Sequence, residues 1–565
     1  KAAGLTDEVL DRYWITESDG HTLSVFPGSE HLRYVIPFAA PDATIEHLRF
    51  LASRRQGAVA VFGDDGEKFG VWPETHKTCF QDGWLQHFFR LLEENQEWIT
   101  MALPSDVIQS DSPGGNIWLP ECSYREMTEW ALPPAQQIAC INARHNAKSD
   151  PQQALIVPFI RGGSWKNFRS KYPEANEMYA RMMVISNRLE RMPRDSITDT
   201  IAYDEAIDSL YRGQCNCAYW HGAFGGIYLP HLRNAIYQSF ITAENALDRA
   251  EGRPSTWVEA ISSDFEFDGK TEVRLSNEHF DLWIAPSTGG MVYEFDLRGQ
   301  RHNILATLDR RPEAYHDQVR AGPGKARSII DSSQQATFKH EGLSEKLLYD
   351  NTRRKSLIDH FFDVDASSAA IISGEAMERG DFATGAYEAS IRRNPDRMQV
   401  LLSRTGNVWG IPFTLSKAIT LSAGSNTVEI GYKLEDLPAD FCQHLAVEFN
   451  FAGLPAQAKG RCFKDNNGLN LGHLGTHLDL KETSLVSLED DWLDIRVSLE
   501  CGVASNGGHA GFWTFPIESV SQSEDGFELI HQSVVVMPHW IVTPDANGCW
   551  DVLIKVSVAD HINTP

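Results

Sequence analysis

The sequence contains no long hydrophobic run, no low-complexity tract and no repeat of solenoid length. Hydrophobic residues make up 42% of the 565 positions, but they never form the ~18 consecutive apolar residues that a membrane-spanning helix needs. At roughly 100 to 200 residues per domain, a chain of this length is expected to fold into two to four soluble domains with substantial cores.

Cysteine is scarce and irregularly placed. The nine cysteines are odd in number and share no repeated spacing, which argues against a disulfide framework. A cytoplasmic location is therefore expected. The chain opens at Lys1, with no methionine and no leader of secretory type, so we expect part of the natural amino terminus to precede it.

Positive charge is also in deficit. The 51 Lys and Arg residues face 77 Asp and Glu residues, which gives a formal net charge of −26. Such a surplus repels the phosphate backbone of nucleic acids and anionic membrane surfaces. We predict a neutral substrate, no nucleic-acid partner and no membrane partner.

Between residues 30 and 250, short apolar runs alternate with amphipathic segments of helical length. Pro41-Asp42 begins one such segment, and the run "AVAVF" (58–62) follows it. An apolar run without alternation predicts a strand buried on both faces, as in a parallel sheet. The theme repeats with a helix after Gly83 and the run "ITMAL" (99–103), so α/β is the predicted class for this part. The apolar residues expected to face inward are Ile45, Leu48, Leu51 and Ala52 in the first helix and Trp84, Leu85, Phe88, Phe89 and Leu92 in the second.

The pattern changes near residue 256. Three further helices are predicted over 124–132, 176–192 and 229–250. Beyond them, short alternating segments separated by Gly, Asn, Asp and Pro turns predict a large antiparallel β-sandwich. The predicted domains are residues 1–115, residues 116–255, which are helical, and residues 256–565, the β domain.

The stretch "GDDGEKFGVW" (63–72) follows the first predicted strand directly. It therefore lies at the carboxyl end of a parallel strand, where α/β proteins carry their active sites. Mutual repulsion of Asp64, Asp65 and Glu67 is expected to raise the pKa of at least one of these carboxyls and to keep an acid protonated near neutrality. A solvated acidic turn is one alternative, and a Ca²⁺ or Mg²⁺ site is another.

A second dense stretch, "GQCNCAYWHGAFGGIYLPHLR" (213–233), mixes aromatic rings with cysteine and histidine. Cys215, Cys217 and His221 are three possible zinc ligands, but a structural site needs a fourth, which no nearby motif supplies. The rings of residues such as Trp220 suit the apolar faces of sugars, with imidazole at the hydroxyl rim. An aromatic core around a Gly-rich turn is the structural alternative.

Four long segments of the chain are distinctive: "AVFGDDGEKFGVWPET" (60–75), "WLPECSYREMTEW" (118–130), "RGGSWKNFRSKYPEAN" (161–176) and "CNCAYWHGAFGGIYLPHLR" (215–233). Together they resemble glycoside hydrolase family 57, in its 4-alpha-glucanotransferase and alpha-amylase branch. Segments of the β region, such as "LDRRPEAYH" (308–316), resemble the same branch. The resemblance covers nearly the whole chain, in order.

The resemblance implies an incomplete (β/α)7 barrel, a helical region and a β-sandwich of galactose-mutarotase type. It implies a retaining mechanism with two carboxylates about 5 Å apart. Asp65 matches the family's acid/base, while Glu67 and Trp72 match positions that line the sugar subsites. Trp220 and His221 match a motif that contacts the glucan. No cofactor and no metal is implied.

The family's nucleophilic Glu and its amino-terminal His-Gln-Pro motif lie upstream of all the matched segments. Glu17 and Glu121 are the nearest candidates in this chain, but neither stands in the family's nucleophile context. The chain is therefore expected to be truncated, to be completed by a separate polypeptide or a second copy, or to be a noncatalytic remnant.

The predicted activity is that of a 4-alpha-glucanotransferase acting on α-1,4-glucan or maltooligosaccharide. The alternatives are an alpha-amylase, a noncatalytic glucan-binding protein, and a metal-dependent hydrolase that uses Asp64, Asp65 and Glu67. Transfer and hydrolysis share every step up to the glycosyl-enzyme and differ only in the acceptor.

Overall fold

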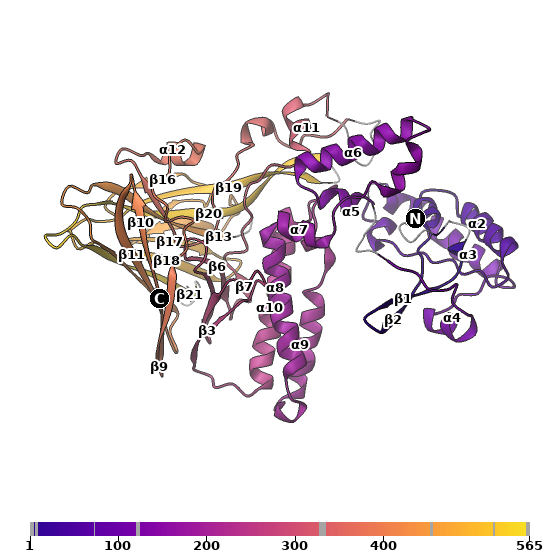
Figure 1. Cartoon of the computed structure of the whole chain (residues 1–565), viewed down its shortest axis with the longest axis horizontal. Coiled ribbons are helices and arrows are strands. Elements are labelled where there is room, and N and C mark those ends of the chain that lie inside the picture. Colours follow the sequence, from indigo (N-terminus) through magenta and orange to yellow (C-terminus); the bar gives the residue numbers. More distant parts are fainter. Residues whose placement is uncertain are drawn as a thin grey trace. The chain divides into compact units, whose positions relative to one another are not determined.

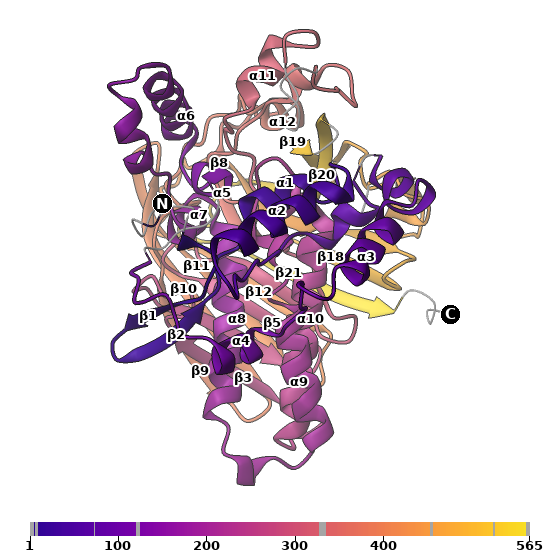
Figure 2. The ribbon, with the colours of Figure 1, turned by 90° about the vertical axis from the view of Figure 1, so that its right-hand side faces the viewer.

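The chain divides into two compact units. A computed structural model describes residues 5, 9–72, 74–119, 125–326, 335–452, 456–523 and 526–560. The first unit comprises residues 1–124 and 140–164, and the second comprises residues 125–139 and 165–565. Figure 1 shows the elements of both units and Figure 2 shows them from the side.

The first unit is mainly helical. Its strands pair as an antiparallel hairpin, β1 (Trp14–Ser18) with β2 (His21–Val25). Its helices are α1 (Glu30–Val35), α2 (Pro41–Arg54), α3 (Trp84–Glu94) and α4 (Pro104–Ser110). A small core of Leu32, Ile36 and Trp84 joins α1 to α3. The start predicted for α2 at Pro41 is confirmed, because proline occupies its first turn.

The strand predicted over 58–62 is not present. Within this run only Val61 forms a bridge, a parallel one with Gly28, and the Val59 N–H donates to the Asp11 carbonyl. Phe62 is 37% exposed. A strand needs hydrogen bonds to a neighbouring strand along its length. The described residues offer the run 58–62 only isolated hydrogen bonds on each side, so it stays irregular.

The second strand predicted in this unit, over 99–103, is also wrong. These residues have no strand partner, and Met101 is 81% exposed. Two of the predicted inward positions are exposed as well, Ala52 on α2 and Phe89 on α3. Helical periodicity identified the apolar stripe of each helix, but the small core of the first unit covers only part of that stripe.

The helices of the second unit confirm the predicted segments. They are α5 (Arg125–Trp130), α7 (Trp165–Lys171), α8 (Pro173–Arg191), α9 (Thr200–Arg212) and α10 (Pro230–Ala250), while α6 (Pro134–Ser149) has residues in both units. The long helices α8, α9 and α10 lie side by side in both views (Figures 1 and 2). In the part of the chain that the structure describes, no helix is long and apolar enough to cross a membrane.

Three antiparallel sheets follow the helices. The largest has nine strands, in the order β15-β14-β17-β18-β21-β12-β11-β10-β9. A sheet of five strands has the order β16-β19-β20-β13-β8, and another has the order β3-β4-β5-β6-β7. The bounds of these strands are β3 (Val258–Ser263), β4 (Glu272–Asn277), β5 (Phe280–Ala285), β6 (Met291–Leu297), β7 (His302–Asn303), β8 (Ile358–Phe362), β9 (Glu388–Asn394), β10 (Arg397–Val408), β11 (Ile411–Ser422), β12 (Thr427–Glu435), β13 (Gln443–Ala452), β14 (Arg461–Asp465), β15 (Asn470–Gly472), β16 (Leu478–Leu480), β17 (Leu485–Asp490), β18 (Ile495–Cys501), β19 (Gly511–Ser523), β20 (Gly526–Val542) and β21 (Trp550–Asp560). Two short helices, α11 (His316–Ala321) and α12 (Ser368–Ser373), lie in the connections.

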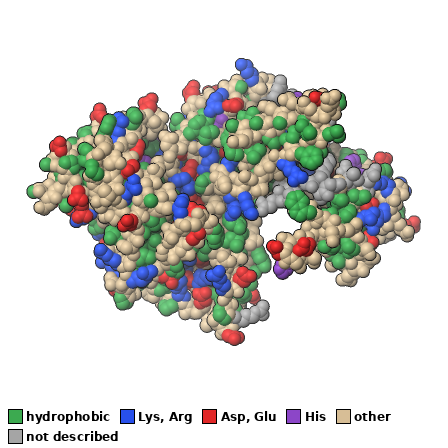
Figure 3. Space-filling model, in the orientation of Figure 1, with side chains coloured by type: hydrophobic (Ala, Val, Ile, Leu, Met, Phe, Trp, Pro, Cys, Tyr) green, Lys and Arg blue, Asp and Glu red, His purple; other side chains and the backbone are tan. Residues whose placement is uncertain are grey.

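The strands of the nine-stranded sheet alternate between buried and more exposed residues. This pattern is clear in β12, β18 and β21, so one face of the sheet meets the core. That core also contains residues of the other two sheets, as the predicted sandwich requires. Acidic and basic side chains are interspersed over the face of the molecule shown in Figure 3.

Strands β4, β5 and β6 are buried along their whole length. One face meets the sandwich core, and the other meets α8 and α10 through charged side chains. Arg181 of α8 donates to Glu294 of β6 at 2.8 Å and to Glu244 of α10 at 2.6 Å. The helices are therefore fixed to the sheet by ion pairs as well as by apolar packing.

We expect the buried His302 of β7 to make the protein sensitive to acid. Burial lowers the pKa of its imidazole to about 4, from an ordinary value of 6.5. The unfolded chain therefore takes up a proton as the pH falls through 6.5 while the folded chain does not, so folding stability present above pH 6.5 is lost toward pH 4. Between pH 7 and pH 5 this one group is expected to remove about 2 kcal/mol.

His302→Gln removes the titrating group. In urea unfolding followed by tryptophan fluorescence, the variant is expected to lose about 2 kcal/mol less between pH 7 and pH 5 than the natural chain. If the free energy of unfolding falls equally with pH in the two proteins, the imidazole takes up its proton equally in the folded and unfolded states, and the prediction is contradicted.

Candidate functional site

The acidic loop of the first unit places three predicted site residues next to one another. Asp65 immediately precedes a short 3₁₀ helix, Gly66–Phe69. The Glu67 carbonyl accepts the N–H of Trp72 at 3.1 Å, which folds the loop back on itself. The side chain of Asp65 is 55% exposed, so it is open to a ligand.

The neighbouring Asp64 does not crowd Asp65 with negative charge in the way that the sequence predicted. Its carboxylate is buried, with 1% of the side chain exposed, and it is ion-paired with Lys68. Arg33 of α1 lies 3.4 Å from Asp64 and 4.0 Å from the Asp65 carboxylate. The two cations, Lys68 and Arg33, offset the acidic charge. They lie 35 residues apart in the sequence, and the Lys68 ammonium joins their segments because it also donates to the Arg33 carbonyl.

An aromatic wall flanks this loop. The rings of Phe38 and Trp72 are nearly parallel, with centroids 6.2 Å apart. The Lys68 ammonium lies 5.3 Å from the Phe38 centroid and 5.6 Å from that of Trp72. Phe38 is 55% exposed. An open carboxylate on a loop that also carries a partly exposed indole, with the exposed Phe38 ring beside it, suits the hydroxyl rim and the apolar face of a sugar.

The other two predicted site residues belong to the second unit, where both are buried. Trp220 is 7% exposed, and its ring lies 5.0 Å from Trp165 and 4.6 Å from Phe168. Gly226 permits this packing, because it adopts φ +52° and a Cβ there would lie 1.8 Å from the Trp220 carbonyl oxygen. The described contacts of Trp220 are packing contacts, and its contact with a glucan stays a prediction.

His221 is held as a neutral imidazole. Its Nδ1–H donates to the Gly225 carbonyl at 2.9 Å, so its Nε2 accepts from the Tyr315 hydroxyl at 2.9 Å. The ring stacks on Tyr228 with a centroid distance of 4.0 Å. Burial lowers the pKa of the imidazole to about 4. His221 thus orients neighbouring hydroxyls and carries no charge at neutral pH.

A buried group of polar side chains, here called the Glu313 cluster, consists of Glu313, Tyr172, Tyr228, His221 and Lys171. The sequence did not point to Glu313 as a site residue. Its Oε1 accepts hydrogen bonds from Tyr172 at 2.5 Å and from Tyr228 at 2.9 Å. Its Oε2 lies 3.1 Å from the Lys171 ammonium. Burial acts most strongly on the pKa of the Glu313 carboxyl and would raise it, but Lys171, the hydrogen bond from Tyr172 and the other polar neighbours together lower the pKa below its ordinary value. Glu313 lies in irregular backbone, so no hydrophobic periodicity points to it. The only signal in the sequence was the segment "LDRRPEAYH" (308–316), which contains it.

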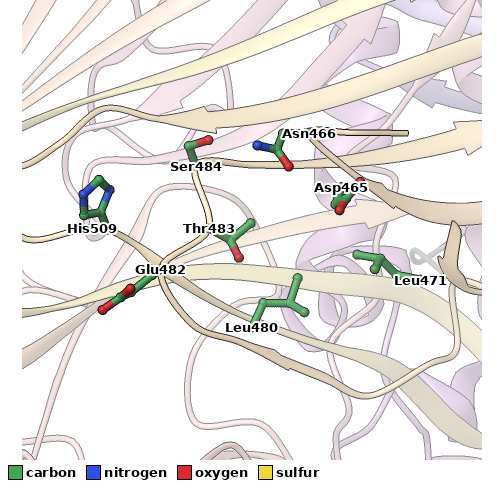
Figure 4. A pocket seen from close by; sticks show the side chains of 8 residues that line it. All are labelled: Asp465, Asn466, Leu471, Leu480, Glu482, Thr483, Ser484 and His509. Carbon is green, nitrogen blue, oxygen red and sulfur yellow. The ribbon is translucent and has the colours of Figure 1, made fainter. Parts of the chain in front are cut away.

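A hollow of about 290 Å³ opens next to Lys171 in the second unit. Its rim carries Arg310 paired with Asp350 at 2.6 Å and Arg353 paired with Asp309 at 2.5 Å. These pairs fix polar groups in place around the cavity. Another hollow, of about 310 Å³ at the β14–β15 hairpin (Figure 4), has no tryptophan, tyrosine or phenylalanine among its eight lining residues.

The remaining candidates of the sequence analysis are placed as follows. Glu17 is exposed at the β1–β2 turn, where its side chain accepts the Gly20 N–H at 2.6 Å. Glu121 lies outside the described residues. Cys215 and Cys217 are exposed while His221 is buried, an arrangement unlike a zinc site. Among the residues described, no three His, Cys, Asp or Glu side chains are grouped to hold a metal ion.

Three family models match consecutive parts of the chain. The model for glycosyl hydrolase family 57 matches residues 3–120. Residues 163–247 match the middle domain of alpha-amylase/4-alpha-glucanotransferase, and residues 264–554 match its C-terminal domain. The matches leave residues 121–162 and 248–263 uncovered, together with a short stretch at each end of the chain.

Individual relatives agree with the family models. The chain is 32% identical to alpha-amylase 1 of Dictyoglomus thermophilum, over 98% of this chain and 77% of that protein. It is 33% identical to a 4-alpha-glucanotransferase of Thermococcus kodakarensis, over 94% of this chain and 74% of that protein. A solved structure, the 4-alpha-glucanotransferase of Thermococcus litoralis, superposes with a TM-score of 0.75 at 31% identity, covering 99% of this chain and 76% of the other.

The Glu313 cluster is expected to be a major source of stability in the second unit. Glu313→Gln keeps an acceptor for the two tyrosines but leaves the Lys171 ammonium buried without its carboxylate. Breaking a buried pair in this way is expected to cost about 3–5 kcal/mol in the free energy of unfolding. Urea unfolding of the variant measures this.

Two further variants separate the charge effect from a shape effect. Glu313→Gln combined with Lys171→Met is expected to regain part of the loss, because no unpaired charge remains buried. Glu429→Gln, which breaks an exposed pair with Arg397, is expected to change stability by less than about 1 kcal/mol. Equal stability of Glu313→Gln and Glu429→Gln would contradict the role given to Glu313.

Proposed function

Because the chain belongs to glycoside hydrolase family 57, we propose that it acts on α-1,4-glucans as a retaining 4-alpha-glucanotransferase, moving maltooligosaccharide segments between 4-hydroxyls. The observation that carries this proposal is the match along 94–98% of the chain to relatives named 4-alpha-glucanotransferase and alpha-amylase. The open carboxylate of Asp65 can supply the acid/base that such a reaction needs, and the rings of Phe38 and Trp72 suit the apolar face of a sugar.

In this mechanism Asp65 is the acid/base. A retaining enzyme first protonates the glycosidic oxygen while a second carboxylate attacks the sugar from the opposite side, which forms a glycosyl-enzyme. The same acid/base then removes the proton of the acceptor hydroxyl. Glu67 and Trp72 belong to the same loop as Asp65, so they are well placed to bind the sugar next to the bond that breaks.

The parallel contacts of the first unit support a barrel. Residues 28 and 61 form one parallel bridge and residues 15 and 116 form another. The Val59 N–H donates to the Asp11 carbonyl between them. Single parallel bridges agree in direction with the parallel strand pairing of a barrel, and we propose an incomplete (β/α)7 barrel for the first unit, with a sandwich of galactose-mutarotase type in the second. The cytoplasmic location stays a prediction.

The metal-dependent alternative is less well supported. A hard cation at this loop would need free carboxylate oxygens from Asp64, Asp65 and Glu67. Asp64 is instead bound by Lys68 and Arg33. Activity that survives a chelator would agree with the glycosidase mechanism, and loss of activity would favour the metal.

Asp65→Asn is expected to remove the proton donor without changing its shape. In the intact protein, turnover of unactivated maltooligosaccharides should fall by a factor of about 10² to 10⁴, while binding of maltotriose changes little. Rates are measured by chromatography of the products and binding by calorimetry. The matched control is Asp82→Asn, which removes an exposed carboxylate of the same unit and should leave the rate unchanged. Turnover by Asp65→Asn at the natural rate would exclude Asp65 from this role.

The acceptor decides between transfer and hydrolysis. Incubating the intact protein with maltotriose alone is expected to give glucose together with longer oligomers, because the 4-hydroxyl of a second sugar attacks the glycosyl-enzyme. A steady rise in reducing ends without longer products would identify an alpha-amylase instead. Binding of maltotriose without any product would identify a noncatalytic glucan-binding protein.

A further inference from the structure

The turn between β10 and β11 holds a tryptophan in a backbone conformation that disfavours it. Trp409 has φ +54° and the following Gly410 has φ +78°, so the hairpin closes with two left-handed residues. Such turns favour Asn-Gly, Asp-Gly or Gly-Gly. A bulky side chain in the first position is strained, and strain of this kind is concentrated at sites that bind ligands.

Packing does not explain this tryptophan, because Trp409 is 56% exposed. The ring is nevertheless fixed in place. The guanidinium carbon of Arg379 lies 4.2 Å from the centroid of the ring, and the backbone N–H of Trp409 donates to the backbone carbonyl of Arg379 at 3.1 Å. Arg379 therefore covers one face of the indole, which leaves the other face for a ligand.

Asp363 in turn fixes Arg379. Its carboxylate accepts three hydrogen bonds from the guanidinium, at distances of 2.7 to 3.1 Å. Arg379 and, to a smaller degree, the Trp409 side chain lower the pKa of Asp363. The carboxylate stays 41% exposed, so it has lone pairs left for a hydroxyl group of a ligand.

We propose that the open face of Trp409 is a stacking platform for an α-glucan chain on the surface of the sandwich. A pyranose ring would lay its C–H face on the indole and direct a hydroxyl to Asp363. This inference rests on the proposed function, because it takes the same polymer as the ligand. One ring binds weakly, but a polymer that is held here and elsewhere on the protein gains from the second contact.

The other exposed features of the second unit lack this combination. Trp492 is 71% exposed at the β17–β18 turn, but no described cation or ring covers either face of it. The hollow of Figure 4 has polar groups and two leucines but no platform. Only Trp409 joins a fixed ring, an open face, a polar group at the rim and a strained backbone among the residues described.

Trp409→Asn is the test. Asparagine is favoured at this turn position, so the variant is expected to unfold at the same temperature as the natural chain or at a higher one. Its retention in gels that contain amylose, and its cosedimentation with insoluble starch, are expected to fall about 3- to 10-fold, as the loss of one stacked ring implies. Trp409→Tyr is expected to keep an intermediate retention. Trp492→Asn, the matched control, should be retained like the natural chain.

Equal retention of Trp409→Asn and the natural chain would overturn the platform, and it would leave the proposed function intact if Asp65→Asn still abolishes turnover. No retention of the natural chain by amylose or starch would also overturn it. A change in sedimentation of Trp409→Asn without a change in retention would make the ring a contact between copies of the chain, and it would overturn the platform as well.

Discussion

Two buried guanidinium groups hold the second unit together. Arg181 of α8 pairs with four carboxyl groups, which come from α10, β5 and β6. They are Glu244, Asp281, Glu294 and Asp296. Arg274 of β4 pairs with two of them, Glu244 and Asp281. Two positive charges thus face four acidic groups, and all six side chains are buried. Burial raises the pKa of Glu294 to about 7 and raises the pKa of Asp296 well above its ordinary value, so protonation of these two carboxyls reduces the imbalance of charge. Loss of Arg181 would leave the carboxylates buried without their main partner, which is among the costliest changes a protein can undergo.

The face of α8 that carries Arg181 forms further buried ion pairs along its length. Glu174, Glu177 and Arg181 follow one another at helical spacing on this face, and all three are buried. Glu174 binds Arg311 at 2.7 Å, and Glu177 binds Lys355 at 2.8 Å. These partners belong to irregular segments of the β domain, which have no ladder of their own to hold them. The helix therefore positions the loops that line the 290 Å³ hollow, as fixed polar groups require a rigid support.

Periodicity in the sequence predicts the elements of the second unit well and the contents of its polar core poorly. Hydrophobic spacing predicts the start of α10. It also predicts the strands β12 and β21, in which buried residues alternate with more exposed ones. The charged face of α8 has the pattern of a solvated surface, and sequence alone does not reveal that partners such as Glu294 lie more than 100 residues away. In the first unit the loop after Val61 was located from its position behind an apolar run, although the run is not a strand. The pairing of Asp64 with Arg33 joins two segments whose approach no local pattern encodes.

The surplus of acidic residues is only partly a property of the protein surface. Part of the negative charge lies inside, on carboxylates that accept hydrogen bonds from Arg, Lys and Tyr side chains and hold them still. A polymer of sugars is neutral and presents many hydroxyl groups, so it is recognised by donors and acceptors at fixed positions more than by net charge. Internal ion pairs supply that rigidity, because each charged hydrogen bond limits the rotation of two long side chains. The negative charge left on the surface does not repel such a substrate, whereas it does repel nucleic acids and anionic lipids.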